Sequence, residues 1–304
     1  MTSLRAAALL AFLAALPAPS RAQTLLGRND SLFTWRGPLP AGALLTVRNH
    51  NGGIDVRAAS GSQVELRAEK RSRSGNLTDV AYDIGTGSNG DVTICSTLRE
   101  HNPCDGERRS WSNDDNDNGR RSVSVSMTLL VPRGARVRVS TGNGAVSVER
   151  VGGEVNATTG NGRVNVLGTD GAVRVTTGNG DVDVREAKGT VRVTTGNGRV
   201  SVSTTEGPVE ARSGNGDIDV RMSAVRAIED MTFGTGSGDV RITLPAGYNG
   251  ELDATTGNGS ITSDFDLKVQ GRMSPRRVRA TIGSGGARLR LMTGNGALEV
   301  RRGQ

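Results

Sequence analysis

The sequence contains few aromatic residues, only two histidines and only two cysteines. Phenylalanine, tryptophan and tyrosine make up 3% of the 304 residues, too few to fill the interior of a large globular domain. Hydrolases need a nucleophile with a base or a pair of carboxylates in a cleft, and neither G-x-S-x-G nor H-E-x-x-H occurs. The sequence therefore predicts no catalytic residue, no metal-dependent activity and no cofactor.

Basic runs with interleaved aromatic residues are also missing, although the formal net charge is +7. Arginine supplies nearly all of the positive charge, and lysine occurs only at positions 70, 188 and 268. The arginines are dispersed among aspartates rather than gathered into one stretch, which argues against nucleic acid as a partner. A basic surface can also attract anionic glycans or lipid headgroups, but arginines dispersed in this way do not by themselves indicate a ligand. The candidate partners are a surface glycan or an envelope component.

Long apolar segments are absent except near the N-terminus. Residues 6–16 are an unbroken apolar run of 11 residues, which is too short to span a bilayer as a helix. Arg5 precedes this run, and Ser20-Arg21-Ala22 has small residues where signal peptidase requires them. We expect residues 1–22 to be a signal peptide and the mature chain to begin at Gln23 without a transmembrane segment. The protein is then exported to the periplasm, the cell surface or the medium.

The two cysteines, Cys95 and Cys104, are close in sequence. In an oxidising compartment such a pair is expected to form a disulfide, and closing so short a loop stabilises the fold by about 2–3 kcal/mol. A shared metal ion is the alternative, but two further ligands are not evident nearby.

Glycine, by contrast, is abundant, at 43 residues or twice the usual share of about 7%. Much of it belongs to a Gly-Asn-Gly turn whose copies lie 18 residues apart. The regular copies are Gly142, Asn143 and Gly144; Gly160, Asn161 and Gly162; Gly178, Asn179 and Gly180; Gly196, Asn197 and Gly198; and Gly214, Asn215 and Gly216. Degenerate copies follow at 236–238, 257–259 and 294–296. Asn-Gly favours a tight turn because both residues tolerate a positive φ.

Between the turns, apolar and polar residues alternate, as in Val173-Arg174-Val175. A period of two indicates β-strands, so each unit contains two short strands. These strands form either antiparallel hairpins in a meander or the coils of a β-solenoid. A constant period favours the solenoid, because equivalent residues then stack in columns about 4.8 Å apart.

The predicted columns are chemically consistent. The inward columns are Val146, Val164, Val182, Val200 and Ile218, and Val148, Val166, Val184, Val202 and Val220. An outward column alternates in sign, from Arg163 to Asp181, Arg199 and Asp217; each opposite-charge pair contributes about 0.2–1 kcal/mol. The turn asparagines are predicted to stack as an amide ladder.

The segments 45–56 and 87–94 repeat the strand, turn and strand pattern. The sequence therefore predicts an all-β fold: a single-stranded β-solenoid, or β-helix, with about 18 residues per coil and two short strands per coil. We assign residues 23–39 to an N-terminal extension or cap and residues 40–302 to one continuous β-repeat domain. Residues 96–121 are predicted to form an insertion loop.

The order of these features resembles the bacterial putative-adhesin β-strand repeat family, a domain of unknown function. The matching segments include LLTVRNHNGGIDV, MTLLVPRGARVRVSTGNGAVSV, ITLPAGYNGELDATTGNGSI and IGSGGARLRLMTGNGALEV, and the resemblance covers residues 40–302. It implies an exported β-helical domain near the cell surface and supplies no catalytic residues.

The predicted insertion loop holds the best candidates for a specific site. Asp114, Asn116 and Asn118 match the first half of a calcium-binding loop, but Val125 stands where the bidentate Glu belongs. Trp111 is the best candidate for a glycan contact. The repeats themselves differ from calcium-binding RTX repeats, because the apolar Val182 occupies the ligand position.

Two further patterns resemble parts of known functional sites. Gly85 to Gly90 spell G-x-G-x-x-G, but a strand follows where a dinucleotide site requires a helix. Asp181, Asp183, Asp217 and Asp219 are spaced to line one face, as in polysaccharide-cleaving β-helices. The leading hypothesis is a non-catalytic exported protein with an adhesive or structural role at the cell envelope. The alternatives are a carbohydrate-active or glycan-binding β-helix and a periplasmic scaffold.

Overall fold

The computed structural model describes residues 23–25, 30–73, 76–98, 123–225, 229–271 and 274–303, in which the strands form two long sheets. In spatial order, sheet A contains β1 (Gln23–Leu25), β6 (Val80–Thr86), β7 (Val92–Leu98), β3 (Leu44–Asn51), β9 (Arg136–Asn143), β11 (Val155–Asn161), β13 (Val173–Asn179), β15 (Val191–Asn197), β17 (Val209–Asn215), β19 (Met231–Ser237), β25 (Arg288–Asn295), β21 (Gly250–Asn258), β24 (Arg277–Ile282) and β23 (Leu267–Val269).

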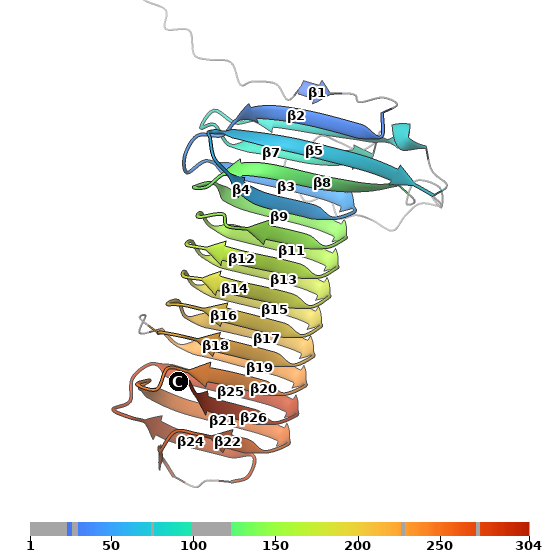
Figure 1. Ribbon diagram of the computed structural model, residues 1–304. Helices are drawn as coiled ribbons and strands as arrows, with labels where there is room; N and C mark the ends of the chain where they lie inside the picture. The colour runs from blue at the N-terminus through green and yellow to red at the C-terminus, as the bar shows by residue number, and fades with distance from the viewer. Residues whose placement is uncertain are drawn as a thin grey trace, which may run out of the picture.

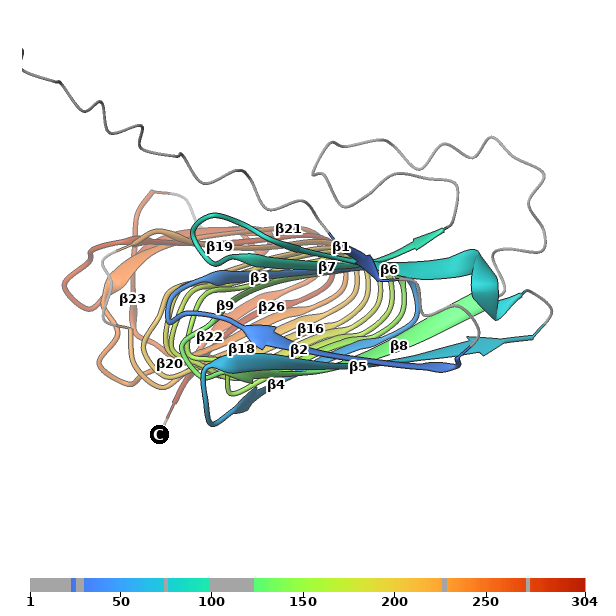
Figure 2. The ribbon, with the colours of Figure 1, turned by 90° about the horizontal axis from the view of Figure 1, so that it is seen from above.

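Sheet B lies opposite sheet A, and its strands continue each coil (Figure 2). In spatial order it contains β2 (Leu32–Pro38), β5 (Gln63–Ser72), β8 (Val123–Pro132), β4 (Ile54–Ala59), β10 (Val146–Glu149), β12 (Val164–Thr169), β14 (Val182–Ala187), β16 (Val200–Thr204), β18 (Ile218–Met222), β20 (Val240–Leu244), β26 (Leu298–Arg302) and β22 (Ile261–Ser263). One 3-10 turn, η1 (Leu77–Asp79), precedes β6.

The central strands stack in parallel, as Figure 1 shows. Residues 18 positions apart pair directly: Val155 with Val173 in sheet A, and Val164 with Val182 in sheet B. This parallel stacking confirms the solenoid arrangement and excludes the meander for the central strands.

The core between the sheets is thin and aliphatic. Both predicted inward columns are buried, with no member more than 1% exposed. β-Branched side chains suit these columns because their restricted rotamers fit a pleated surface. Buried valine and alanine side chains of sheet A, such as Val173 and Ala157, lie in the same core. Short aliphatic side chains from both sheets fill the interior, which explains how the chain folds with so few aromatic residues.

The Gly-Asn-Gly turns connect sheet A to sheet B. The second glycine of each copy has a positive φ, +157° at Gly162 and +156° at Gly180. The asparagines do not, because Arg150 and Glu186 are the only non-glycine residues with positive φ in the described chain. Of the two residues that tolerate a positive φ, only the glycine adopts one here, and the asparagine side chain forms the ladder.

A buried row of hydroxyl groups supports these turns from inside. Thr159 is 2% exposed, and its Oγ1 donates to the carbonyl of Gly144 at 3.0 Å; Thr177 donates to Gly162 at 3.2 Å. Each hydroxyl thus binds the turn of the preceding coil. The signal in the sequence was a hydroxyl-bearing residue before each regular Gly-Asn-Gly, a threonine in four copies and Ser213 in the fifth, and this signal was missed.

At the C-terminal end, the coils do not stack in sequence order. Strands β25 and β26 lie between β19–β20 and β21–β22, so the last coil fills a gap left by the preceding one. At the other end, β3 and β4 lie between β7–β8 and β9–β10. Neither exchange is visible in the sequence period.

The N-terminal end is partly antiparallel, since β2 pairs with β5 and β5 with β8. Trp35 in β2 packs against the core. Strand β7 continues through Leu98, so its last residues, Ser96 to Leu98, are strand where the sequence analysis placed the start of the insertion loop. No helix among the described residues is long and apolar enough to cross a membrane.

Candidate functional site

The turn edge of the solenoid carries an exposed ladder of amides. The Nδ2 of Asn161 donates to the Oδ1 of Asn143 at 2.8 Å, Asn179 to Asn161 at 2.8 Å, and Asn197 to Asn179 at 2.7 Å. Asn215 continues the ladder to Asn197 at 2.8 Å. The predicted amide ladder is therefore present, and it ties each coil to the next along one edge.

Replacing one rung tests how much this ladder contributes. We expect Asn179→Ala to lower the free energy of unfolding by about 1 kcal/mol, because it removes hydrogen bonds to both neighbouring coils. Asn165→Ala is the matched control, since Asn165 is exposed on β12 and has no such ladder partner. Urea denaturation of both variants measures the difference, and equal stabilities would show that the amide ladder contributes nothing.

Beside the amide ladder runs the predicted column of alternating charge. Arg163 lies 3.1 Å from the carboxylate of Asp181, and Arg199 lies 3.6 Å from that of Asp217. Asp181 also accepts the backbone N–H of Arg199 at 3.0 Å. This amide, with smaller help from Arg163, holds the pKa of the Asp181 carboxyl below its ordinary value. The column thus stabilises the stacking of the coils.

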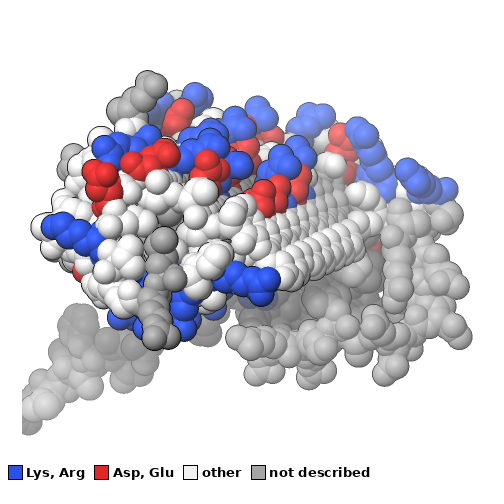
Figure 3. Space-filling view, turned by 90° about the horizontal axis from the view of Figure 1, so that it is seen from below, with Lys and Arg blue, Asp and Glu red and all other residues white. Residues whose placement is uncertain are grey.

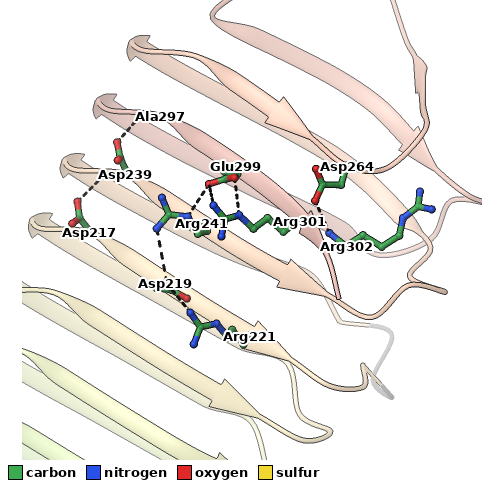
Figure 4. A network of polar contacts seen from close by, with 10 residues as sticks. All are labelled: Asp217, Asp219, Arg221, Asp239, Arg241, Asp264, Ala297, Glu299, Arg301 and Arg302. Atoms are coloured by element: carbon green, nitrogen blue, oxygen red, sulfur yellow. Dashed lines mark hydrogen bonds and ion pairs between the residues drawn. The ribbon is translucent and has the colours of Figure 1, made fainter. Parts of the chain in front are cut away.

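Farther along the solenoid, two more aspartates accept a hydrogen bond from a backbone N–H of the next coil. Asp217 accepts the N–H of Asp239 at 3.0 Å, and Asp239 accepts that of Ala297 at 2.8 Å (Figure 4). Of these two aspartates, only Asp217 was expected to have a partner, and that partner was an arginine. The missed signal was an aspartate directly after the turn where the next coil offers a backbone donor.

The outward face of sheet B is also paired within itself. Asp183 accepts from Nε of Arg185 at 3.0 Å, and Asp219 lies 3.5 Å from Arg221. Figure 3 shows acidic and basic side chains intermingled along one side of the molecule, beside an uncharged strip of parallel rows.

Near the C-terminus, the pairs of sheet B join into a network. The carboxylate of Glu299 accepts hydrogen bonds from Nε of Arg301 at 2.6 Å and from Nε of Arg241 at 2.7 Å. Both arginines point toward it in Figure 4. Arg301 first, and Arg241 second, hold the pKa of the Glu299 carboxyl below its ordinary value. A glycosidase acid requires the opposite shift, upward, so that it carries a proton at neutral pH.

Within the described ranges, no three His, Cys, Asp or Glu side chains converge to hold a metal ion. The G-x-G-x-x-G segment forms the hairpin between β6 and β7, in which Gly90 donates its N–H to Gly87 at 3.0 Å. It opens no helix and so lacks the feature that binds a dinucleotide.

One open groove lies at the C-terminal end of sheet B. It has a volume of about 320 Å³ and is lined by Ile261, Leu267, Pro275 and Val278 together with hydroxyl-bearing residues. Among the described residues, no charged side chain lines it. Its serine and threonine hydroxyl groups therefore have no carboxylate or imidazole beside them, within that part of the chain, to act as a base.

The candidates of the predicted insertion loop fall outside the described residues. These are Cys104, Trp111, Asp114, Asn116 and Asn118. Cys95 is buried in β7, 3% exposed. The disulfide, the calcium loop and the glycan contact therefore stay predictions, whereas every glycine and asparagine of the regular turns lies where the repeat places it.

The stacked coils with their ladders match the family model described as Toastrack DUF4097 over residues 44–301. The chain belongs to this family. The resemblance drawn from the sequence is thereby confirmed, and the Toastrack match covers both the regular coils and the irregular ends.

Solved structures similar to this Toastrack chain share little sequence with it. One is a putative cell adhesion protein from Clostridium sporogenes, with a TM-score of 0.28 and 10% identity over 90% of this chain and 100% of the other. A putative adhesin from Bacteroides fragilis has a TM-score of 0.45 and 12% identity over 89% and 96%. A putative adhesin from Parabacteroides merdae has a TM-score of 0.39 and 10% identity over 90% and 97%. No curated protein matches the chain.

Proposed function

We propose that this Toastrack protein is a non-catalytic, exported protein of the cell envelope with an adhesive or structural role. The observation that carries the proposal is the pairing of its charged side chains. The aspartates that a β-helix hydrolase would use, Asp183 and Asp219, lie on an outward sheet face and bind neighbouring arginines. A carboxylate held in this way is a structural group.

The architecture supports the same role. Stacked coils bonded along their whole length make a stiff, elongated body, and they present the same side chain at each step. Such a surface suits a repetitive partner, such as a surface glycan or another envelope component, better than a small substrate that needs an enclosed pocket.

Export is part of the proposal. Cleavage after Ala22 would leave β1 intact, because that strand begins at Gln23. In the oxidising compartment beyond the membrane, we propose that Cys95 and Cys104 form a disulfide.

Fractionation of cells that produce the full chain tests this directly. We expect the protein in the envelope or outside the cell, with Gln23 as its first residue and without thiols that react under denaturing conditions. Replacing Ala22 and Ser20 by bulky residues, as in Ala22→Phe with Ser20→Phe, should leave the precursor uncleaved. A full-length, cytoplasmic protein with two reactive thiols would contradict the proposal, and recovery solely in the periplasm would favour the scaffold.

The hydrolase alternative has its own test. Cleavage of acidic polysaccharides by the purified protein, abolished in both Asp183→Ala and Asp219→Ala, would replace the non-catalytic role. The ion pairs of these aspartates lead us to expect no cleavage by either the wild type or the variants.

A further inference from the structure

The outward face of sheet A differs in charge from that of sheet B. Arg138, Asn156, Arg174 and Arg192 stack in one column on β9, β11, β13 and β15. The three arginines are exposed. Arg174 and Arg192 are direct neighbours in the register, so this column places like charges next to each other.

The described residues supply few carboxylates to these arginines. Arg138 and Arg174 form no ion pair with any described residue, whereas Arg192 lies 3.5 Å from Glu210, which also binds Arg212 at 3.0 Å. Like charges on adjacent strands destabilise a sheet. On sheet B, by contrast, Arg185 and Arg221 each pair with an aspartate of the same strand.

A second column beside the arginines carries hydroxyl groups. Ser140, Thr158, Thr176 and Thr194 pair from coil to coil on the same four strands. The three threonines are exposed, and Ser140 is partly exposed. We call the two columns together the arginine–threonine stripe. It offers guanidinium donors and hydroxyl groups in parallel rows on one flat surface.

We propose that the arginine–threonine stripe binds a linear acidic polysaccharide, whose chain runs along the solenoid axis. This inference rests on the proposed function and names the class of its ligand. Guanidinium groups bind carboxylate and sulfate groups bidentately, and the hydroxyl column is placed to bind the hydroxyls of the sugars.

The spacing of the stripe suits a polymer with regularly placed acids. Neighbouring coils are about 4.8 Å apart, which separates the positions of Arg174 and Arg192 by one such step. Arg138 and Arg174 are two coils apart, or about 10 Å. An extended sugar chain advances by about one coil spacing per sugar. Its acidic groups can therefore follow the arginines without bending of the sugar chain.

A nucleic acid fits this surface less well. Proteins that hold single-stranded nucleic acid combine basic grooves with aromatic side chains on which the bases stack. Neither column of the stripe contains an aromatic residue on β9, β11, β13 or β15. The stripe therefore recognises charge and hydroxyl groups without a platform for bases.

Binding to heparin, which is sulfated, and to alginate, which is carboxylated, tests the inference on the full mature chain. We expect Arg138→Gln combined with Arg174→Gln to weaken binding at least about tenfold and to reduce its salt dependence. The matched control is Arg185→Gln combined with Arg221→Gln, which removes the same charge from sheet B. This control should stay within about twofold of the wild type. Arg138→Lys with Arg174→Lys should lose part of the affinity because lysine cannot bind bidentately.

Thermal melting establishes that each variant is folded before binding is compared. Three results would overturn the inference: no binding of the wild type to either polysaccharide, an equal loss in the sheet B control, or tighter binding to single-stranded DNA than to both polysaccharides. Any of them leaves export and the envelope role intact if fractionation supports these. A cytoplasmic protein would instead refute the proposed function, whatever it binds in solution.

Discussion

Truncation after Ala287 is expected to abolish cooperative folding of the C-terminal coils. It removes β25 and β26, which pair with β19 and β20 on one side and with β21 and β22 on the other. The buried side chains lost are Leu289, Leu291, Leu298 and Val300, each 0% exposed. Their burial contributes about 8 kcal/mol, comparable to the whole stability of a typical domain. Urea denaturation and limited proteolysis measure the effect.

Truncation after Arg302 is the control, because it removes only Gly303 and Gln304 and leaves both strands complete. We expect this shorter truncation to unfold at nearly the same urea concentration as the full chain. If the truncation after Ala287 also keeps the urea midpoint and the protease resistance of the full chain, the last coil is not needed to hold the neighbouring coils together.

Gly180→Ala is expected to lower the free energy of unfolding by about 3 kcal/mol or more. Gly180 has φ +156°, a conformation that side chains disfavour, and an added Cβ would overlap the carbonyl oxygen of Gly162 in the preceding coil. The backbone cannot easily shift to relieve this overlap, because Gly180 also donates its N–H to the carbonyl oxygen of Asn197 in the following coil at 2.8 Å. The measurement is the urea midpoint at an unchanged slope.

Gly134→Ala provides the comparison for this substitution. An added Cβ at Gly134 meets no atom within 4 Å, and its φ is not positive. We expect a change within about 0.5 kcal/mol. Similar losses in the two variants would mean that glycine contributes through the unfolded chain rather than through the close approach of neighbouring turns.

Much of the central solenoid follows from the sequence alone. A constant 18-residue step makes each residue pair with its own equivalent, so the valine columns, the amide ladder and the Arg163–Asp181 pair can be counted directly along the chain. The physical reason is that parallel stacking converts a period in sequence into a column in space. The same step placed Val182 inward, and this valine is buried.

Only the tertiary structure decided how the ends are built and how charge is divided between the faces. The placement of β25–β26 before β21–β22 depends on which strand edges remain open after the earlier coils have paired, a non-local competition that leaves no period to count. The aspartate that accepts a backbone N–H likewise needs the next coil in place, as Asp239 needs Ala297. The sequence determined the repeating unit and its turns, because these depend on residues close in the chain. The order of the terminal coils, and the finding that Arg138 and Arg174 form no ion pair with any described residue, emerge only when distant segments become neighbours.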